Sequence, residues 1–308
     1  MAATDAIIHQ ILIMLVLIVT GIVCCKINLI TEEVNKKLSL LVLYLVNPAL
    51  IIMSYQIKFQ PDYLEGLAVT FGISFASMVL SILLAKVAIR GQDSADGNMA
   101  IERFSVVYSN CGFMGIPLIN GLIGTKGVFY LTSYLTAYNF LVWTHGIMSI
   151  KGERSFKHLT NIIRTPAIIA TAIGLLFFIV RVRIPSVISS ALGYLGDMNT
   201  PMAMLVAGAA IAQANLLKAF VKPRIYLVTV LKLIAVPAIA ILVFLPFFSD
   251  RTILLTVMIA AACPVGTMGT LFALSCKKNA AYASELFAFT TVFSIATLPL
   301  MTFVFHLL

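Results

Sequence analysis

Long apolar runs alternate with short polar segments along the whole chain, and each run is long enough to form a membrane-spanning helix. A helix needs about 20 mostly apolar residues to cross the hydrocarbon core of a bilayer. The first run has no basic residue before it, so we interpret it as a span rather than a signal peptide. The pattern predicts ten spans, over residues 6–25, 38–56, 66–90, 101–123, 126–150, 165–183, 188–216, 225–248, 251–275 and 280–307.

The longest polar interruption, residues 151–164, divides these spans into two sets of five. We therefore expect a first repeat over residues 1–150, a cytoplasmic connecting loop over 151–164, and a second repeat over 165–308. Because five is an odd number, the second set must insert upside down relative to the first. Inverted repeats of this kind are a widespread transporter design. The predicted fold class is an all-α polytopic membrane protein made of two inverted five-helix repeats.

Composition supports a membrane protein and excludes several other classes. Hydrophobic residues make up 61% of the 308 residues, charged residues 11%, and the mean hydropathy is +1.04. A soluble chain cannot cover that much apolar surface with polar residues. The net charge of +9 does not indicate a nucleic-acid partner, because the basic residues lie at the ends of apolar runs and form no recognised binding motif. The lipid bilayer is the expected environment.

No catalytic or metal-binding arrangement stands out in the sequence. The five cysteines form no CxxC pair or Cys/His cluster, so we expect neither a metal site nor a disulfide framework. Walker, HExxH and GxSxG motifs are also absent from the sequence. We therefore expect no enzyme activity, no cofactor and no pumping driven by ATP.

The distribution of basic residues predicts the orientation in the membrane. Loops after odd-numbered spans carry 15 Lys and Arg residues, the other loops and the termini carry 5, and Lys232 lies inside a span. Because basic residues favour the cytoplasmic side, this count places both termini outside. The expected location is the cell membrane, as a multi-pass protein.

Weak internal similarity supports two related halves. Matched pairs of positions recur at offsets of 152–154 residues, which is about half the chain. The pairs are Asn47-Pro48 with Thr200-Pro201, Cys111 with Cys263, and Met114-Gly115 with Met268-Gly269.

Residues that break helices gather at these matched positions. The fourth span contains two glycines and a proline within residues 110–117, and the ninth contains a proline and two glycines within 263–270. Proline removes a backbone donor and glycine makes an unwound conformation cheap. Broken backbone is tolerated in a membrane only inside protein or beside water, so we expect two broken helices that cross near the membrane centre. Their free N–H groups suit an anion and their carbonyls a cation; ordinary packing kinks are the alternative.

Five segments of the sequence form a distinctive set of motifs, at residues 45–52, 109–118, 138–143, 195–204 and 262–266. Together they resemble the auxin efflux carrier family of membrane transporters, which includes bacterial malate or malonate permease-like proteins. The resemblance covers nearly the whole chain and implies an inverted-repeat fold with two crossing broken helices, like that of bile-acid symporters. It also implies a scaffold domain, a moving transport domain and small organic anions such as carboxylates as substrates. By motif position it assigns Asn110, Gly112, Pro117 and Pro264 to the crossing region.

Several residues are candidates for contact with the substrate, each with a structural alternative. Asn47 precedes Pro48, which we expect to break the second span, and Asn110 lies at the start of the predicted crossing. Each could either cap freed backbone or bind the substrate. Lys232 lies about 12 Å beyond the cytoplasmic boundary at Arg224, where a lysine must line water, pair with an anion or reach back to the interface. An anion partner for Lys232 would be Asp197, Glu285 or the substrate. The candidate set is Asn47, Asn110, Gly112, Gly115, Pro117, Asn139, Lys232, Pro264, Gly266 and Thr267.

Other polar residues have less distinctive roles. Asp197 could bind a coupling proton or Na⁺, or cap a helix at the outer interface. Glu285, His145 and His306 are expected at the interfaces. The polar residues of the fifth span, Tyr134, Tyr138 and Asn139, could bond across helices or simply pack.

The predicted function is a secondary transporter that moves small organic anions, mono- or dicarboxylates, across the membrane by alternating access. A pore-type channel and a membrane-embedded ligand sensor are the alternatives. Few charges are available to line a pore, and no signalling domain accompanies a sensor. Coupling to H⁺ or Na⁺ and assembly into a homodimer are left open.

Overall fold

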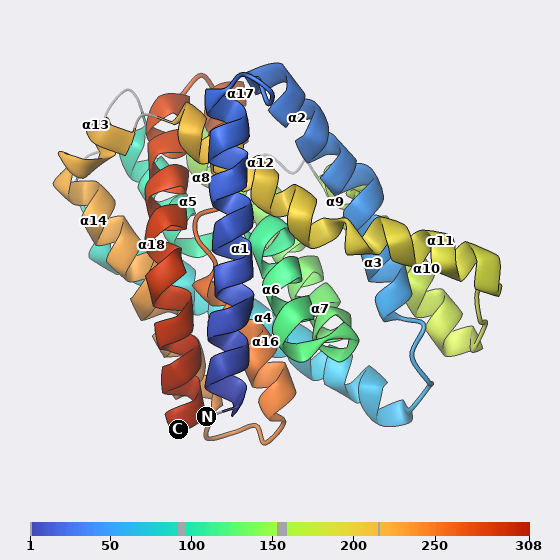
Figure 1. Ribbon diagram of the computed structural model, residues 1–308. Helices are drawn as coiled ribbons and strands as arrows, with labels where there is room; N and C mark the ends of the chain where they lie inside the picture. The colour runs from blue at the N-terminus through green and yellow to red at the C-terminus, as the bar shows by residue number, and fades with distance from the viewer. Residues whose placement is uncertain (1, 92–96, 153–158, 215) are drawn as a thin grey trace.

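The computed structural model describes residues 2–91, 97–152, 159–214 and 216–308, and over these residues the chain is a bundle of helices without a strand (Figure 1). The all-helical class predicted from the sequence is confirmed. The first half contains α1 (Ala2–Lys26), α2 (Glu32–Leu41), α3 (Asn47–Ser54), α4 (Pro61–Ala88), α5 (Asn98–Val107), α6 (Ile116–Ile123), α7 (Thr125–Leu141) and α8 (Ile147–Lys151). The second half contains α9 (Leu159–Arg164), α10 (Pro166–Val180), α11 (Ser186–Asp197), α12 (Asn199–Gln213), α13 (Leu216–Phe220), α14 (Pro223–Val230), α15 (Val236–Phe244), α16 (Arg251–Ala262), α17 (Met268–Ser275) and α18 (Ala280–Leu307).

Helical segments overlie every apolar run predicted from the sequence. Within the described ranges, four stretches are long and apolar enough to cross a membrane: Glu32–Ser54, Pro61–Ala88, Pro223–Phe244 and Ala280–Leu307. Shorter apolar helices occupy much of the remaining runs. The region 151–164, predicted to be a loop, contains the short helix α9, and residues 153–158 lie outside the described residues.

Four π-helical turns join helices that would otherwise be continuous: Val42–Val46, Cys111–Gly115, Val142–Gly146 and Leu231–Ala235. Three of them are followed at the second residue by a proline, namely Pro48, Pro117 and Pro237. A proline lacks the N–H and crowds the carbonyl of the preceding turn, and a widened turn relieves both problems. The prediction that Pro48 breaks the second span is therefore wrong, because Glu32–Ser54 continues through its π turn.

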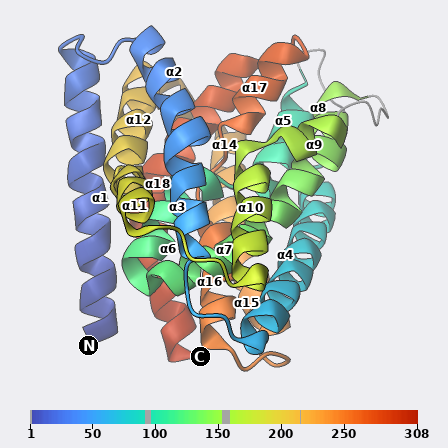
Figure 2. The same cartoon turned by 90° about the vertical axis from the view of Figure 1, so that its right-hand side faces the viewer.

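The interior of the bundle is formed largely by α7 and α16, most of whose side chains are buried. Around them, α1 packs on α12, α3 packs on α10 and α11, and α4 packs on α7. Exposed large apolar side chains such as Val16, Leu83 and Leu242 cover the outside of the bundle, as lipid contact requires. Both termini lie at the same end of the molecule (Figures 1 and 2).

Candidate functional site

Two broken helices cross inside the bundle and hydrogen-bond to each other through their main chains. After α5 the chain is non-helical over residues 108–110, and after α16 it is non-helical over residues 263–266. The Asn110 N–H donates to the Pro264 carbonyl at 2.7 Å, and the Gly266 N–H donates to the Tyr108 carbonyl at 3.0 Å. Ser109 and Val265 thereby form an isolated antiparallel bridge. This crossing was predicted, but its β-type pairing was not.

Close approach of the two backbones explains the glycine at position 266. A Cβ placed there would lie 3.0 Å from the Ser109 carbonyl oxygen and 3.3 Å from its carbon. Those atoms belong to the backbone of the partner segment and cannot move aside cheaply. Gly266 is thus required for the crossing.

Gly112 has a different role from the one that the sequence indicated. It was predicted to be unwound, but it lies in the π-helical turn Cys111–Gly115, and a Cβ there would meet no atom within 4 Å. Pro117 likewise sits inside the helical continuation, as the second residue of α6, where its missing N–H costs little. The break is confined to residues 108–110 because the following turn absorbs the proline. Gly112 faces open space, whereas a Cβ at Gly115 would press on Cys111 and Cys263.

Asn47 bridges the first half to the second. Its side-chain N–H donates to the Gly112 carbonyl at 3.3 Å, and its oxygen accepts from the Asn199 amide at 2.6 Å. Asn47 and Asn199 are both buried, and their separation in sequence matches the offset of the internal similarity. Asn47 therefore satisfies backbone at the π turn, as its structural alternative proposed, while the Asn199 oxygen has no partner among the described residues.

Asn110 is buried at the start of the same turn, and its backbone carbonyl accepts from Met114 at 2.9 Å. Its side chain does not cap that turn and makes no hydrogen bond with the described part of the chain. The capping alternative for Asn110 is therefore wrong. A buried amide with unused hydrogen-bonding capacity at a helix start is available to a ligand.

Lys232 is completely buried beside the crossing, with 0% of its surface exposed. Its ammonium lies 3.4 Å from the carbonyl of Val107, the last residue of α5. The C-terminal end of a helix carries partial negative charge, so this contact is favourable but leaves the formal charge uncompensated. The alternative in which Lys232 reaches back to the interface is wrong.

The two carboxylates suggested as partners of Lys232 lie elsewhere. Glu285 is buried and forms an ion pair with Lys222, which lies in the α13–α14 connection, so its carboxylate already has a partner. Asp197 is exposed at the end of α11 and does not cap α12, whose first turn has no side-chain cap. Neither pairs with Lys232 within the described ranges.

The remaining sequence candidates divide between the crossing and ordinary packing. Pro264 supplies the carbonyl that Asn110 binds, and Thr267 is exposed at the start of α17. Asn139 is buried but bonds back to the Leu135 carbonyl at 2.7 Å, which is local helix packing.

Further polar contacts surround the crossing. The Tyr108 hydroxyl donates to the Leu141 carbonyl at 2.9 Å and lies 3.0 Å from His145 Nδ1. Ser109 Oγ contacts the Tyr134 hydroxyl at 3.2 Å, so Tyr134 bonds across helices, as one of its two predicted roles proposed. Sequence reasoning missed Tyr108, although it lies directly before the segment 109–118.

A second polar cluster, centred on Glu102 in the middle of α5, was also missed. Two nitrogens of Arg224, Nε and Nη2, donate to the Glu102 carboxylate and make three contacts of 2.6 to 2.9 Å. The Tyr282 hydroxyl donates to the same carboxylate at 2.8 Å. The Glu102 side chain is 2% exposed. The cluster joins α5, α14 and α18 and leaves no free charge.

Comparison with known proteins points in one direction. The model of a family described as "Membrane transport protein" matches residues 6–160 and 153–302, nearly the whole chain. The uncharacterized transporter MJ1031 of Methanocaldococcus jannaschii is 26% identical over 94% of this chain and 96% of its own length.

Proposed function

Because the chain belongs to the membrane transport protein family, the auxin efflux carrier family that its motifs resemble, we propose that it is a secondary transporter that moves small organic anions, mono- or dicarboxylates, by alternating access. It is a multi-pass membrane protein of a transporter family. The proposal adds the substrate class and the mechanism.

The uncompensated charge of Lys232 is the observation that carries the substrate class. A buried ammonium is costly unless an anion accompanies it. Among the described residues, its ammonium has one hydrogen-bond partner, the Val107 carbonyl at 3.4 Å. A substrate carboxylate would supply the missing negative charge and would be attracted from water by the same ammonium.

The elements around Lys232 also suit a carboxylate. The turn Cys111–Gly115 and helix α17 both start at the crossing, where free N–H groups carry partial positive charge. Asn110 offers an unused amide, and the space beside Gly112 is open. In this proposal the substrate lies between Lys232 and Asn110, and Asp197 remains a candidate for binding a coupling H⁺ or Na⁺.

Alternating access requires two bodies that move relative to each other. We assign residues 1–150 and 165–308 to two inverted repeats of five spans, joined by residues 151–164. The buried Asn47–Asn199 contact and the antiparallel pairing of the two breaks support a pseudo-twofold relation between the halves. The crossing segments would belong to the moving body.

Uptake of radiolabelled malonate and malate into proteoliposomes tests the proposal. A carrier gives saturable uptake that an excess of unlabelled anion inhibits. Uptake that rises linearly without saturation would favour a channel. Ligand binding without any flux would favour a sensor.

A further inference from the structure

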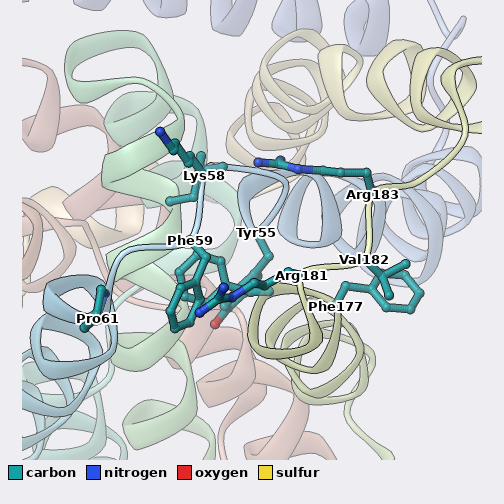
Figure 3. A pocket seen from close by; sticks show the side chains of 10 residues that line it. Tyr55, Lys58, Phe59, Pro61, Phe177, Arg181, Val182 and Arg183 are labelled. Atoms are coloured by element: carbon teal, nitrogen blue, oxygen red, sulfur yellow. The ribbon is translucent and has the colours of Figure 1, made fainter.

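A cavity of about 380 Å³ is lined by residues of the segments 55–61 and 177–183, none of which belongs to the crossing. It lies between the α3–α4 loop and the last turn of α10, and Tyr55 and Phe178 are buried beside it. Figure 3 shows Arg181 beside the rings of Tyr55 and Phe59, with Lys58 and Arg183 on the two loops. Its volume lies in the range of small-ligand sites, about 300–1,000 Å³.

Basic residues gather here on the side where they are scarce. The predicted outer loops carry five basic residues, and three of them line this one cavity. The acidic residues nearest in sequence, Asp62 and Glu65 on α4, do not line it. The five are Lys58, Lys126, Arg181, Arg183 and Arg251.

The backbone and a ring hold Arg181 in place. It ends α10 in the left-handed conformation, with φ at +60°, and its N–H donates to the Phe178 carbonyl at 3.3 Å. Its guanidinium lies 4.6 Å from the centre of the Phe59 ring. A ring covers the face of a guanidinium and leaves its edge N–H groups free for an anion.

Contacts between the two loops preorganise the cavity. Arg183 donates to the Gln56 main-chain carbonyl, and the Ile184 N–H donates to the Gln56 side-chain oxygen at 3.1 Å. The Gln56 side-chain nitrogen is buried without a partner among the described residues. These hydrogen bonds hold the α3–α4 and α10–α11 connections together and leave the Gln56 side-chain N–H groups free to donate to a ligand.

We propose that this cavity binds a carboxylate or phosphate carried on an apolar body, with Arg181 as the main anion contact. No carboxylate of the described chain pairs with Arg181, Arg183 or Lys58. The aromatic side chains would cover the apolar body. A soluble aromatic carboxylate and the headgroup of an anionic lipid both have this chemistry. The inference does not rest on the proposed transport activity.

Protection of a cysteine placed in the cavity tests the proposal locally. Val182→Cys lies in the lining, and peptide mass spectrometry measures its rate of modification by a neutral maleimide, separately from the native cysteines. The protein is held in phosphatidylcholine nanodiscs, with benzoate added in one arm and phosphatidylglycerol included in the other. We expect at least one of them to slow modification, and Arg181→Gln in the same protein to weaken that protection about tenfold.

Arg251→Gln is the matched control, because Arg251 lies 5.7 Å from the Phe305 ring on the same side of the protein but outside the cavity. It should leave protection unchanged. Protection by benzoate alone identifies a soluble anion as the ligand, and protection by phosphatidylglycerol alone identifies a lipid. Protection by neither, or protection that survives Arg181→Gln, overturns the proposal whatever the flux measurements show.

Discussion

The Gly266 N–H donates to the Tyr108 carbonyl at 3.0 Å, which joins two helix breaks that lie more than 150 residues apart in sequence. Together with the Asn110–Pro264 bond, it satisfies backbone groups that neither broken helix can satisfy internally. An unsatisfied backbone group costs several kcal/mol in hydrocarbon. At the crossing, each broken helix thus supplies hydrogen-bond partners for the other.

Gly266→Ala should destabilise the protein, because its Cβ would lie 3.0 Å from the Ser109 carbonyl oxygen. Overpacking of this kind typically costs about 1–3 kcal/mol. Gly112→Ala is the control, since a Cβ there meets no atom within 4 Å. Thermal unfolding in detergent should show a lower midpoint for the first variant only. Equal midpoints would mean that the backbones are not in close contact.

The buried amide pair Asn47–Asn199 should couple the two halves energetically. A double-mutant cycle with Asn47→Ala and Asn199→Ala is expected to give a coupling free energy of about 0.6–1.7 kcal/mol, the range for hydrogen bonds between membrane helices. The measurement is unfolding of each single and double variant. Strict additivity would argue against the contact.

Sequence patterns predicted the all-helical fold, the positions of the helices and the location of the crossing. They failed for individual prolines and glycines, whose effect on a helix depends on the structure around them. Pro48 and Pro117 were interpreted as breakers because proline disrupts a straight α-helix, whereas a π turn before each one accommodates it. Glycine content alone also could not distinguish Gly112, which faces open space, from Gly266, which touches backbone.

Ion pairs between residues that are distant in sequence also could not be predicted. The ion pair of Glu285 with Lys222 was not predicted, because it depends on how α18 meets the α13–α14 connection. The Glu102–Arg224 pair was missed for the same reason, since 122 residues separate its members. Burial of Lys232, in contrast, was predictable from its position inside an apolar run.

Glu102→Gln should destabilise the protein by about 2 kcal/mol, since it leaves Arg224 without its buried carboxylate partner. Because the Arg224 side chain is 49% exposed, this value is lower than that for a fully buried pair. Lys37→Gln provides the contrast: its pair with Glu33 is 71% and 77% exposed, and its loss should change unfolding by less than about 0.5 kcal/mol. Similar unfolding midpoints for the two variants would contradict a structural role for Glu102.

The predicted orientation is tested by two single cysteines. Val182→Cys lies in the α10–α11 connection, which the basic count places outside, and Ser155 lies in the connection between the halves, outside the described residues. In intact cells, a membrane-impermeant maleimide should label Val182→Cys and not Ser155→Cys, because the basic loops face the cytoplasm. Permeabilised cells serve as the control, in which both should react. The reverse pattern in intact cells would invert the topology.

Charge at Lys232 decides whether the crossing binds an organic anion. The affinity for malonate is measured from the shift that malonate causes in the thermal unfolding midpoint. We expect this affinity to fall about tenfold or more in Lys232→Gln, because a charge-assisted contact is lost, and to fall less in Lys232→Arg. Without malonate, Lys232→Gln should be as stable as the original protein or more stable, since a buried and uncompensated charge has been removed. Unchanged malonate binding, or a clear loss of stability in the empty protein, would contradict substrate recognition by this lysine.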